Sequence, residues 1–343
     1  MDVVNVVVMA PILGRDLSWL EAVDKRVRVL DANDAVPRRS PSGQTGPPKA
    51  DSPAVNEMLA EADVLLVGYP VPANLAARAP RLAWAHHTQA GVSNLVGSDL
   101  WSSSLPLTSS RGVVGVVPIA EYVLAAAAYF ARGLHEGSRQ KAAGAFTRDG
   151  YGGITLRGAT MGIIGLGGIG REVARLSRAV GMRVIATRRS ITEPQSDVDG
   201  ADLLLPAGGI LEMAAESDFL AVCAQHTPET RWIVNERVFS AMKPGAVLIN
   251  VARGEEVDED ALLDAVKAGR IGGAVLDVYD GELAGRPPRP ELAESPHILL
   301  TPHISAGGET VFAEPIRELF VENLRRFLDG QPLLNLVDRE RGY

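Results

Sequence analysis

Three side chains with acid–base or anion-binding chemistry, Arg253, Glu282 and His303, each follow a separate apolar run late in the chain. A histidine takes up and gives off a proton near neutral pH, and a neighbouring carboxylate stabilises its protonated form. A guanidinium binds a carboxylate and polarises a carbonyl oxygen. Each residue alone also fits a solvated surface position, so the hypothesis of a joint site depends on where the fold places them.

Apolar runs rich in β-branched residues alternate with helical or irregular segments, which predicts an α/β fold with parallel sheets and crossover helices. The strands expected in the first part are Val3–Met9, Arg26–Leu30, Val64–Gly68 and Leu82–His86. Those expected in the second part are Met161–Ile164, Arg183–Ala186, Phe219–Cys223, Ala246–Asn250, Gly273–Asp277 and Ile298–Thr301, with a short optional strand at Leu203–Leu205. Long helices are expected at Pro118–Arg132 and Glu309–Leu328.

Parallel strands deliver their carboxyl ends to one edge of a sheet, so the arginine, the acid and the histidine are expected to meet there. A glycine motif, Gly165-x-Gly167-x-x-Gly170, lies between a strand and a helix and belongs to the same edge. Its first glycine permits a tight turn, its second lets the backbone approach a pyrophosphate, and its third lets helix and strand pack closely. The helix N-terminus then faces the anion, which predicts a dinucleotide site rather than a merely structural turn.

The residues after the next expected strand indicate which dinucleotide binds. NAD sites place an acid about 20 residues beyond the glycine motif to bind the ribose 2′-hydroxyl. Here Thr187, Arg188, Arg189 and Ser190 occupy that place, and no acid is among them. Because guanidinium groups bind a phosphate well, we expect NADP(H) to be preferred, with NAD(H) as an alternative cofactor. Two solvated arginines are the other interpretation.

Composition restricts the class of protein. The chain has 343 residues, which predicts about two domains, and a net charge of −8, which argues against a nucleic-acid partner. A single cysteine, Cys223, excludes an internal disulfide, suits a reducing cytoplasm and is expected to be a buried small residue. No signal peptide is evident, and the most apolar stretch, Val116–Phe130, is too short to span a bilayer. A cytoplasmic protein with no membrane partner and no metal site is expected.

Two loops of the first part also follow strands and are candidates for ligand contact. They are Tyr69–Pro72 and Thr88–Val92, and in the second Ala90 and Gly91 would expose backbone N–H groups to an anion such as a carboxylate. Trp84, His86 and His87 are candidates for lining a pocket. Between the strands lies Pro37–Pro53, a Pro-, Ser- and Gly-rich segment that reads as a surface loop.

Six motifs together resemble the D-isomer-specific 2-hydroxyacid dehydrogenase family, and specifically its glyoxylate/hydroxypyruvate reductase-like branch. They are Gly165–Gly170, His226–Thr230, Met242–Ala246, Asn250–Gly254, Leu276–Tyr279 and Thr301–Gly307. The resemblance implies two doubly wound parallel-sheet domains with a cleft between them. A flavodoxin-like substrate domain would comprise residues 1–107 and 308–343, and a Rossmann dinucleotide-binding domain residues 108–307. It also implies a homodimer.

Carried over residue by residue, the resemblance makes Arg253, Glu282 and His303 catalytic and assigns substrate binding to Ala90, Gly91 and Arg253. The cofactor-binding residues that it and the glycine motif imply are Gly165, Gly167, Gly168, Ile169, Gly170, Thr187, Arg188, Arg189, Ser190, Ala224, Thr230, Val251, Ala252, Asp277, His303 and Ser305. The implied reaction transfers a hydride between a nicotinamide and a small 2-oxo acid or D-2-hydroxy acid.

The chain departs from the family pattern in three places. Leu283 stands where a proline usually follows the glutamate, Gly285–Pro290 is unusually rich in Pro and Arg, and Gln225 replaces a common proline. The first two departures directly follow Glu282 in the sequence, and the third lies in a loop expected to contact the cofactor. Two other functions share the fold: a nucleotide-sensing transcriptional corepressor, which the acidic charge disfavours, and a formate or phosphite dehydrogenase. The glutamate disfavours the formate version.

Overall fold

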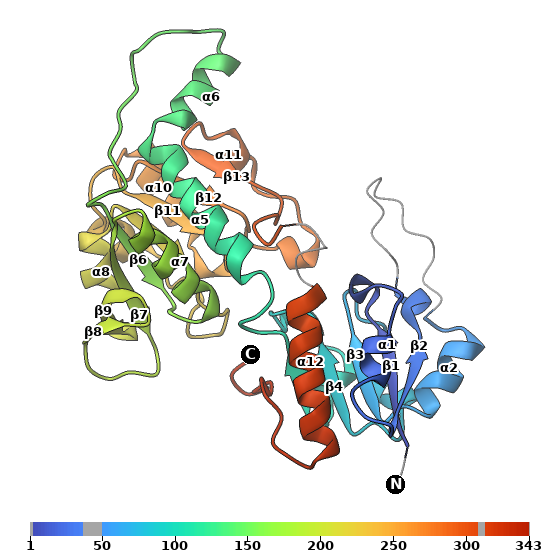
Figure 1. Ribbon diagram of the computed structural model, residues 1–343. Coiled ribbons are helices and arrows are strands. Elements are labelled where there is room, and N and C mark those ends of the chain that lie inside the picture. The colour runs from blue at the N-terminus through green and yellow to red at the C-terminus, as the bar shows by residue number, and fades with distance from the viewer. Residues whose placement is uncertain (1–2, 37–49, 308–312, 343) are drawn as a thin grey trace. The chain divides into compact units, whose positions relative to one another are not determined.

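The chain contains two separate, mainly parallel sheets, each within its own unit (Figure 1). The computed structural model describes residues 3–36, 50–307 and 313–342. Unit 1 comprises Met1–Val114 with Gly308–Tyr343, and unit 2 comprises Gly115–Gly307. Most of the predicted loop Pro37–Pro53 lies outside the described residues.

Unit 1 is built on a five-stranded parallel sheet with the order β2-β1-β3-β4-β5, the flavodoxin-like order. Its strands are β1 Val4–Met9, β2 Val27–Asp31, β3 Val64–Val67, β4 Trp84–His87 and β5 Leu107–Ser109. Its helices are α1 Ser18–Glu21, α2 Pro53–Ala60, α3 Leu75–Arg78, α4 Asp99–Ser102 and α12 Ala313–Leu328. The edge strand β5 was not predicted. Unit 1 continues to Val114, whereas the sequence analysis placed the domain boundary after residue 107.

Helix α12 returns from the end of the chain to cover the sheet of unit 1 (Figure 1). Its Phe320 is fully buried and stacks on Trp84 of β4, with the ring centroids 5.1 Å apart. The ring of His86 packs edge-on against the same phenylalanine at 5.4 Å. Trp84, His86 and His87 are all 0% exposed. The expectation that they line a substrate pocket is therefore wrong: Trp84 and His86 pack against Phe320 of α12, and His87 is buried beside Asn94.

The two neighbouring histidines are buried as neutral rings. The His86 ring bonds to the hydroxyls of Thr108 and Ser110 at 2.8 and 3.0 Å, and the amide of Asn94 lies 3.1 Å from His87 Nε2. Burial lowers the pKa of His86 to about 3 and that of His87 to about 4. Both rings are therefore polar parts of the core and carry no charge near neutral pH.

We expect acid to destabilise the protein through these two rings. Unfolded histidines bind protons below a pKa of about 6.5, whereas His86 and His87 resist protonation until their folded pKa values of about 3 and 4. Their contribution to the free energy of unfolding is complete above pH 6.5 and is lost as the pH falls toward 4. Urea unfolding across this range measures it.

Replacing His86 with Gln keeps a polar side chain and should flatten the pH dependence of the urea midpoint, whereas replacing the exposed His297 with Gln should not. NMR titration of either buried ring near pH 6.5 in the folded protein would contradict this account.

Unit 2 is built on an eight-stranded sheet with the order β13-β12-β11-β10-β6-β7-β9-β8, parallel except for β8. Its strands are β6 Thr160–Ile164, β7 Arg183–Arg188, β8 Gln195–Val198, β9 Ala201–Pro206, β10 Phe219–Val222, β11 Val247–Asn250, β12 Gly273–Leu276 and β13 Ile298–Leu300. Its helices are α5 Val116–Ala131, α6 Leu134–Ala142, α7 Gly168–Ala179, α8 Ile210–Glu216, α9 Glu236–Ala241, α10 Glu259–Lys267 and α11 Pro290–Glu294. The six principal strands and the optional one are confirmed, whereas β8 and α6 were not predicted.

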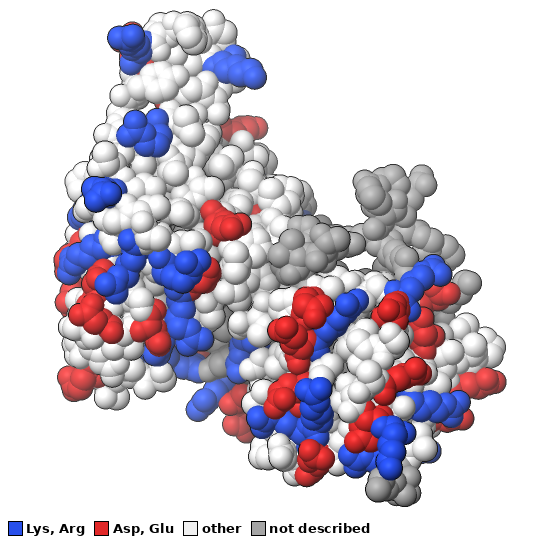
Figure 2. Space-filling view, in the orientation of Figure 1, with Lys and Arg blue, Asp and Glu red and all other residues white. Residues whose placement is uncertain are grey.

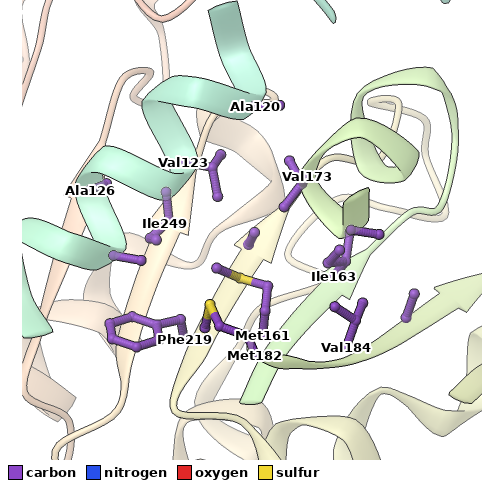
Figure 3. Close-up of a cluster of buried hydrophobic side chains, with 14 of the residues drawn as sticks. Ala120, Val123, Ala126, Met161, Ile163, Val173, Met182, Val184, Phe219 and Ile249 are labelled. Carbon is purple, nitrogen blue, oxygen red and sulfur yellow. The ribbon is translucent and has the colours of Figure 1, made fainter. Parts of the chain in front are cut away.

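Alternate residues of the central strands face two separate hydrophobic clusters, so the sheet of unit 2 is covered on both faces. On β10, for example, Phe219 belongs to one cluster and Leu220 to the other. Figure 3 shows the first cluster, in which small residues of α5 lie opposite Val173 of α7 above the sheet. Small side chains such as Ala120 let α5 lie close to α7 and to the sheet. The apolar run that contains α5 is thus a core helix of unit 2.

Among the described residues, no single helix has the length and hydrophobicity needed to cross a bilayer; α5 and α6 reach the threshold only together, and they are bent by 69°. The same residues contain no group of three or more His, Cys, Asp or Glu side chains placed to hold a metal ion.

Candidate active site

The register of unit 2 aligns the ends of its central strands in one row. Neighbours in this row are paired across the sheet, and they are Thr187, Ile164, Val222, Asn250, Leu276 and Leu300. All of these strands are parallel, so the loops that follow them leave from the same edge. The glycine motif begins at Gly165, directly after the row, and Arg253, Asp277 and His303 lie one to three residues beyond it. The predicted convergence of the strand ends is confirmed.

Each glycine of the motif has a distinct steric reason. Gly165 has a φ of +95°, and a Cβ there would lie 2.8 Å from the backbone of Ala224. A Cβ on Gly170 would lie 2.2 Å from the carbonyl oxygen of Gly165, so this position must be glycine for α7 to pack on the turn. At Gly167, by contrast, a Cβ would meet nothing within 4 Å. The space over Gly167 and the N-terminus of α7, at Gly168, fits a pyrophosphate that approaches the backbone.

His303 and Glu282 form a hydrogen-bonded pair. Nδ1 of His303 lies 2.7 Å from Oε1 of Glu282, and the two side chains are 36% and 22% exposed. Because the carboxylate accepts from Nδ1, the other ring nitrogen, Nε2, faces away from Glu282 and is free to exchange a proton. The pair forms although Leu283 replaces the usual proline, and Glu282 opens a short 3₁₀ turn after Gly281, whose φ is +90°.

Asp277 organises the loop that carries His303. Its buried carboxylate accepts three hydrogen bonds, from the Thr301 hydroxyl at 2.6 Å and from the N–H groups of Ile304 and Ser305 at 2.8 Å each. Its carbonyl accepts from the N–H of His303, which has a φ of +54°. The sequence analysis predicts a cofactor contact for Asp277 and Ser305, and this stays a prediction; in the structure the two residues bond to each other and hold the histidine loop.

Arg253 is fixed through its backbone. Its N–H donates to Oε2 of Glu256 at 3.0 Å, and its carbonyl accepts from the side chain of Asn250 at 2.8 Å. Its guanidinium donates to the carbonyl of Ala252 at 2.6 Å and remains partly exposed. The end of β11, through Asn250, therefore fixes the position of the Arg253 backbone.

The sequence analysis missed Glu256, which is 0% exposed. Burial raises the pKa of its carboxyl to about 8, so at neutral pH the proton is largely retained. In the sequence, Glu255 and Glu256 look like two solvated acids at the start of a helix, and nothing indicates that Glu256 is buried. Burial also raises the pKa of the nearby Cys223 thiol to about 12, which fits its expected inert role.

The residues predicted to select the cofactor lie at the end of β7. Thr187 accepts from the N–H groups of Gly165 and Leu166 through its carbonyl, at 3.2 and 2.9 Å. The guanidinium of Arg188 donates to the carbonyl of Leu166 at 2.9 and 3.2 Å, so it lies against the glycine loop. It also bonds to Asp199 at 2.5 Å, an acid that the sequence analysis did not consider.

The remaining predicted residues take varied positions. Thr230 is held by its hydroxyl, which donates to the carbonyl of Gln225 at 2.8 Å. Arg189 and Ser190 are exposed. Most of the others are buried or partly buried: Ile169, Val251, Ala252, Ala90 and Gly91. Ala90 and Gly91 belong to unit 1, in the segment after β4.

A family model described as "D-isomer specific 2-hydroxyacid dehydrogenase, NAD binding domain" matches residues 124–305, more than half of the chain. The chain belongs to this family. A glyoxylate reductase of Pyrococcus furiosus is 32% identical over 273 residues, which are 76% of this chain and 77% of that protein. A D-3-phosphoglycerate dehydrogenase of Archaeoglobus fulgidus is 32% identical over 239 residues, 67% of this chain. The chain spans about half the length of the D-3-phosphoglycerate dehydrogenases that it matches.

Solved structures of the family share the fold over nearly the whole chain. One is a D-isomer specific 2-hydroxyacid dehydrogenase from Xanthobacter autotrophicus Py2 in complex with NADPH and MES. It has a TM-score of 0.76 and 27% identity, and the match covers 99% of this chain and all of that one.

Gly254 tests how closely the loops of Arg253 and Glu282 must approach. A Cβ at this position would lie 1.9 Å from the carbonyl carbon of Tyr279, so Gly254→Ala must push the two loops apart. We expect it to lower the free energy of unfolding by about 1–3 kcal/mol, as overpacking does. Gly208→Ala, at a site with open space, is the control. Denaturant unfolding measures both, and equal loss in the two variants would contradict the close approach.

Proposed function

We propose that the protein is an NADP(H)-preferring reductase of the D-2-hydroxyacid dehydrogenase family, which converts a small 2-oxo acid into its 2-hydroxy acid. The observation that carries the proposal is the 2.7 Å pair of His303 and Glu282 on the same sheet edge as the glycine loop. A histidine held by a carboxylate is suited to proton transfer.

When bound, the reduced nicotinamide supplies the hydride that the carbonyl carbon of the substrate receives. His303 gives a proton from Nε2 to the carbonyl oxygen, which becomes the hydroxyl. Glu282 accepts from Nδ1, orients the ring and stabilises the imidazolium before transfer. Arg253 binds the substrate carboxylate and polarises the carbonyl. In the oxidative direction His303 accepts the proton instead.

The cofactor assignment is supported by the open space over Gly167 and by the guanidinium of Arg188 beside the glycine loop. The complex of the Xanthobacter relative with NADPH also supports NADP(H) as the cofactor. NAD(H) remains the alternative cofactor.

A small 2-oxo acid is supported by the glyoxylate reductases among the relatives. Unit 2 would be the dinucleotide-binding domain and unit 1 the substrate domain, to which Ala90 and Gly91 contribute backbone N–H groups for the substrate carboxylate. The single cysteine suits a cytoplasmic location.

Turnover of NADPH with glyoxylate, hydroxypyruvate, pyruvate and bulkier 2-oxo acids tests the proposal. His303→Gln should lower kcat by about 100- to 10,000-fold, the usual contribution of a positioned proton donor, and leave the Kd for NADPH unchanged. Glu282→Gln should lower kcat by less than His303→Gln does, because the proton donor stays in place and loses only the carboxylate that orients it. His297→Gln is the control. Tight NADPH binding without turnover of any of these acids would favour a nucleotide-sensing corepressor.

We also propose a homodimer formed through α6 and the stretch that follows it. Large apolar side chains are exposed there: Leu134 by 56%, Tyr151 by 46%, Ile154 by 47%, and Phe146 completely. In Figure 1, α6 and this stretch project from the body of unit 2. Side chains of this kind gathered in one segment are typical of an interface.

Phe146→Ser should shift the protein toward the monomer at low micromolar concentration, because an aromatic anchor is lost from the interface. Val96→Ser removes a comparably exposed residue of unit 1 and should leave the assembly unchanged. Light scattering coupled to size exclusion measures the mass. A wild-type monomer at all concentrations, or unchanged mass in Phe146→Ser, would count against this interface.

A further inference from the structure

A hairpin at the edge of the sheet brings an acid to the cofactor end of the site. Strands β8 and β9 pair antiparallel, with Val198 opposite Ala201, and Asp199 lies in the tight turn between them with a φ of +52°. Its carboxylate oxygen Oδ2 lies 2.5 Å from Nη2 of Arg188, and the two side chains are 37% and 23% exposed. The acid that is absent after β7 is therefore supplied from another element, eleven residues further on.

Asp199 is the acid of this hairpin that pairs with Arg188. Its neighbours Asp197 and Asp202 lie 3.9 and 3.6 Å from Arg178 of α7 instead. The hydrogen bond from Arg188, helped by the charge of Arg171, holds the pKa of Asp199 below its usual range. Asp199 is thus ionised near neutral pH. Figure 2 shows basic and acidic side chains interspersed over the part of unit 2 that carries α7 and this end of the sheet.

The guanidinium cannot easily turn away from the acid. Its Nε and Nη2 atoms both donate to the carbonyl of Leu166, directly before Gly167, and this bond fixes the plane of the group against the glycine loop. A ribose 2′-phosphate that bound Arg188 would have to share it with a carboxylate and would be repelled by that carboxylate. A ribose 2′-hydroxyl has no charge and can donate a hydrogen bond to the same carboxylate.

We propose that Asp199 is a specificity-determining residue that limits the preference for NADP(H) over NAD(H), because its carboxylate competes with the 2′-phosphate for Arg188 and accepts from the 2′-hydroxyl of NAD(H). The inference rests on the proposed function of the glycine loop as a nicotinamide-dinucleotide site. The discrimination between the two cofactors is then a balance between one cation and one anion, and Arg188 alone does not set it.

The test is the Kd of the full-length protein for NADPH and for NADH, measured by calorimetry without substrate. Asp199→Asn keeps the shape of the side chain and suits the left-handed backbone, but it removes the charge. The Kd for NADPH should fall about five- to tenfold, the size of a charge-assisted contact, and that for NADH should rise about twofold or more. Asp197→Asn changes the same charge at a φ of +54° and should leave both Kd values unchanged.

A second arm checks that the effect passes through the arginine. In an Arg188→Gln background, Asp199→Asn should no longer tighten NADPH binding, since the two residues act on each other. Weaker or unchanged NADPH binding in Asp199→Asn alone would overturn the proposal, as would equal effects of Asp197→Asn. Failure of the wild-type protein to bind either dinucleotide would instead refute the proposed function, and this inference with it.

Discussion

The carboxylate of Asp277 is the group on which the candidate site depends most. It is buried at the end of β12, and its three hydrogen bonds all go to the loop after β13. That loop must turn sharply to present His303, whose left-handed backbone is unfavourable for a residue with a side chain. The bonds to Asp277 offset this strain, so the position of His303, the proposed proton donor, is set by a neighbouring strand.

Other residues of the candidate site are likewise held by contacts between neighbouring loops of the sheet edge. Glu282 orients the ring of His303, and Gly254 lets the Arg253 loop lie against the segment that leads to Glu282. The row of paired strand ends supplies the common reference for all of them. Such a site stays preorganised because the sheet, with a hydrophobic cluster on each face, cannot shift one strand alone.

Features that depend on a short stretch of sequence could be predicted. Buried parallel strands read as apolar runs, and the glycine spacing marked the turn before α7, so these features were predicted. Strand β8, Gln195–Val198, is mostly exposed and has no apolar run. Its pairing with β9 is what makes it a strand, and the sequence does not show that pairing. Contacts between distant segments were also beyond reach: nothing near Asp199 indicates that it meets Arg188, and nothing near His86 indicates that α12 covers it.

The β8–β9 hairpin has a further consequence for how this fold can diversify. It lies at the outer edge of the sheet, so its length and turn can change without disturbing the pairing of any inner strand. The strands that carry the proton-transfer groups lie at the opposite end of the sheet order. In the proposed reaction, cofactor choice and proton transfer therefore depend on separable parts of unit 2. In the proposed reaction, a substitution or insertion in this peripheral turn would change the choice between NADPH and NADH, and so the cellular source of reducing equivalents, while the pair of His303 and Glu282 stays as it is.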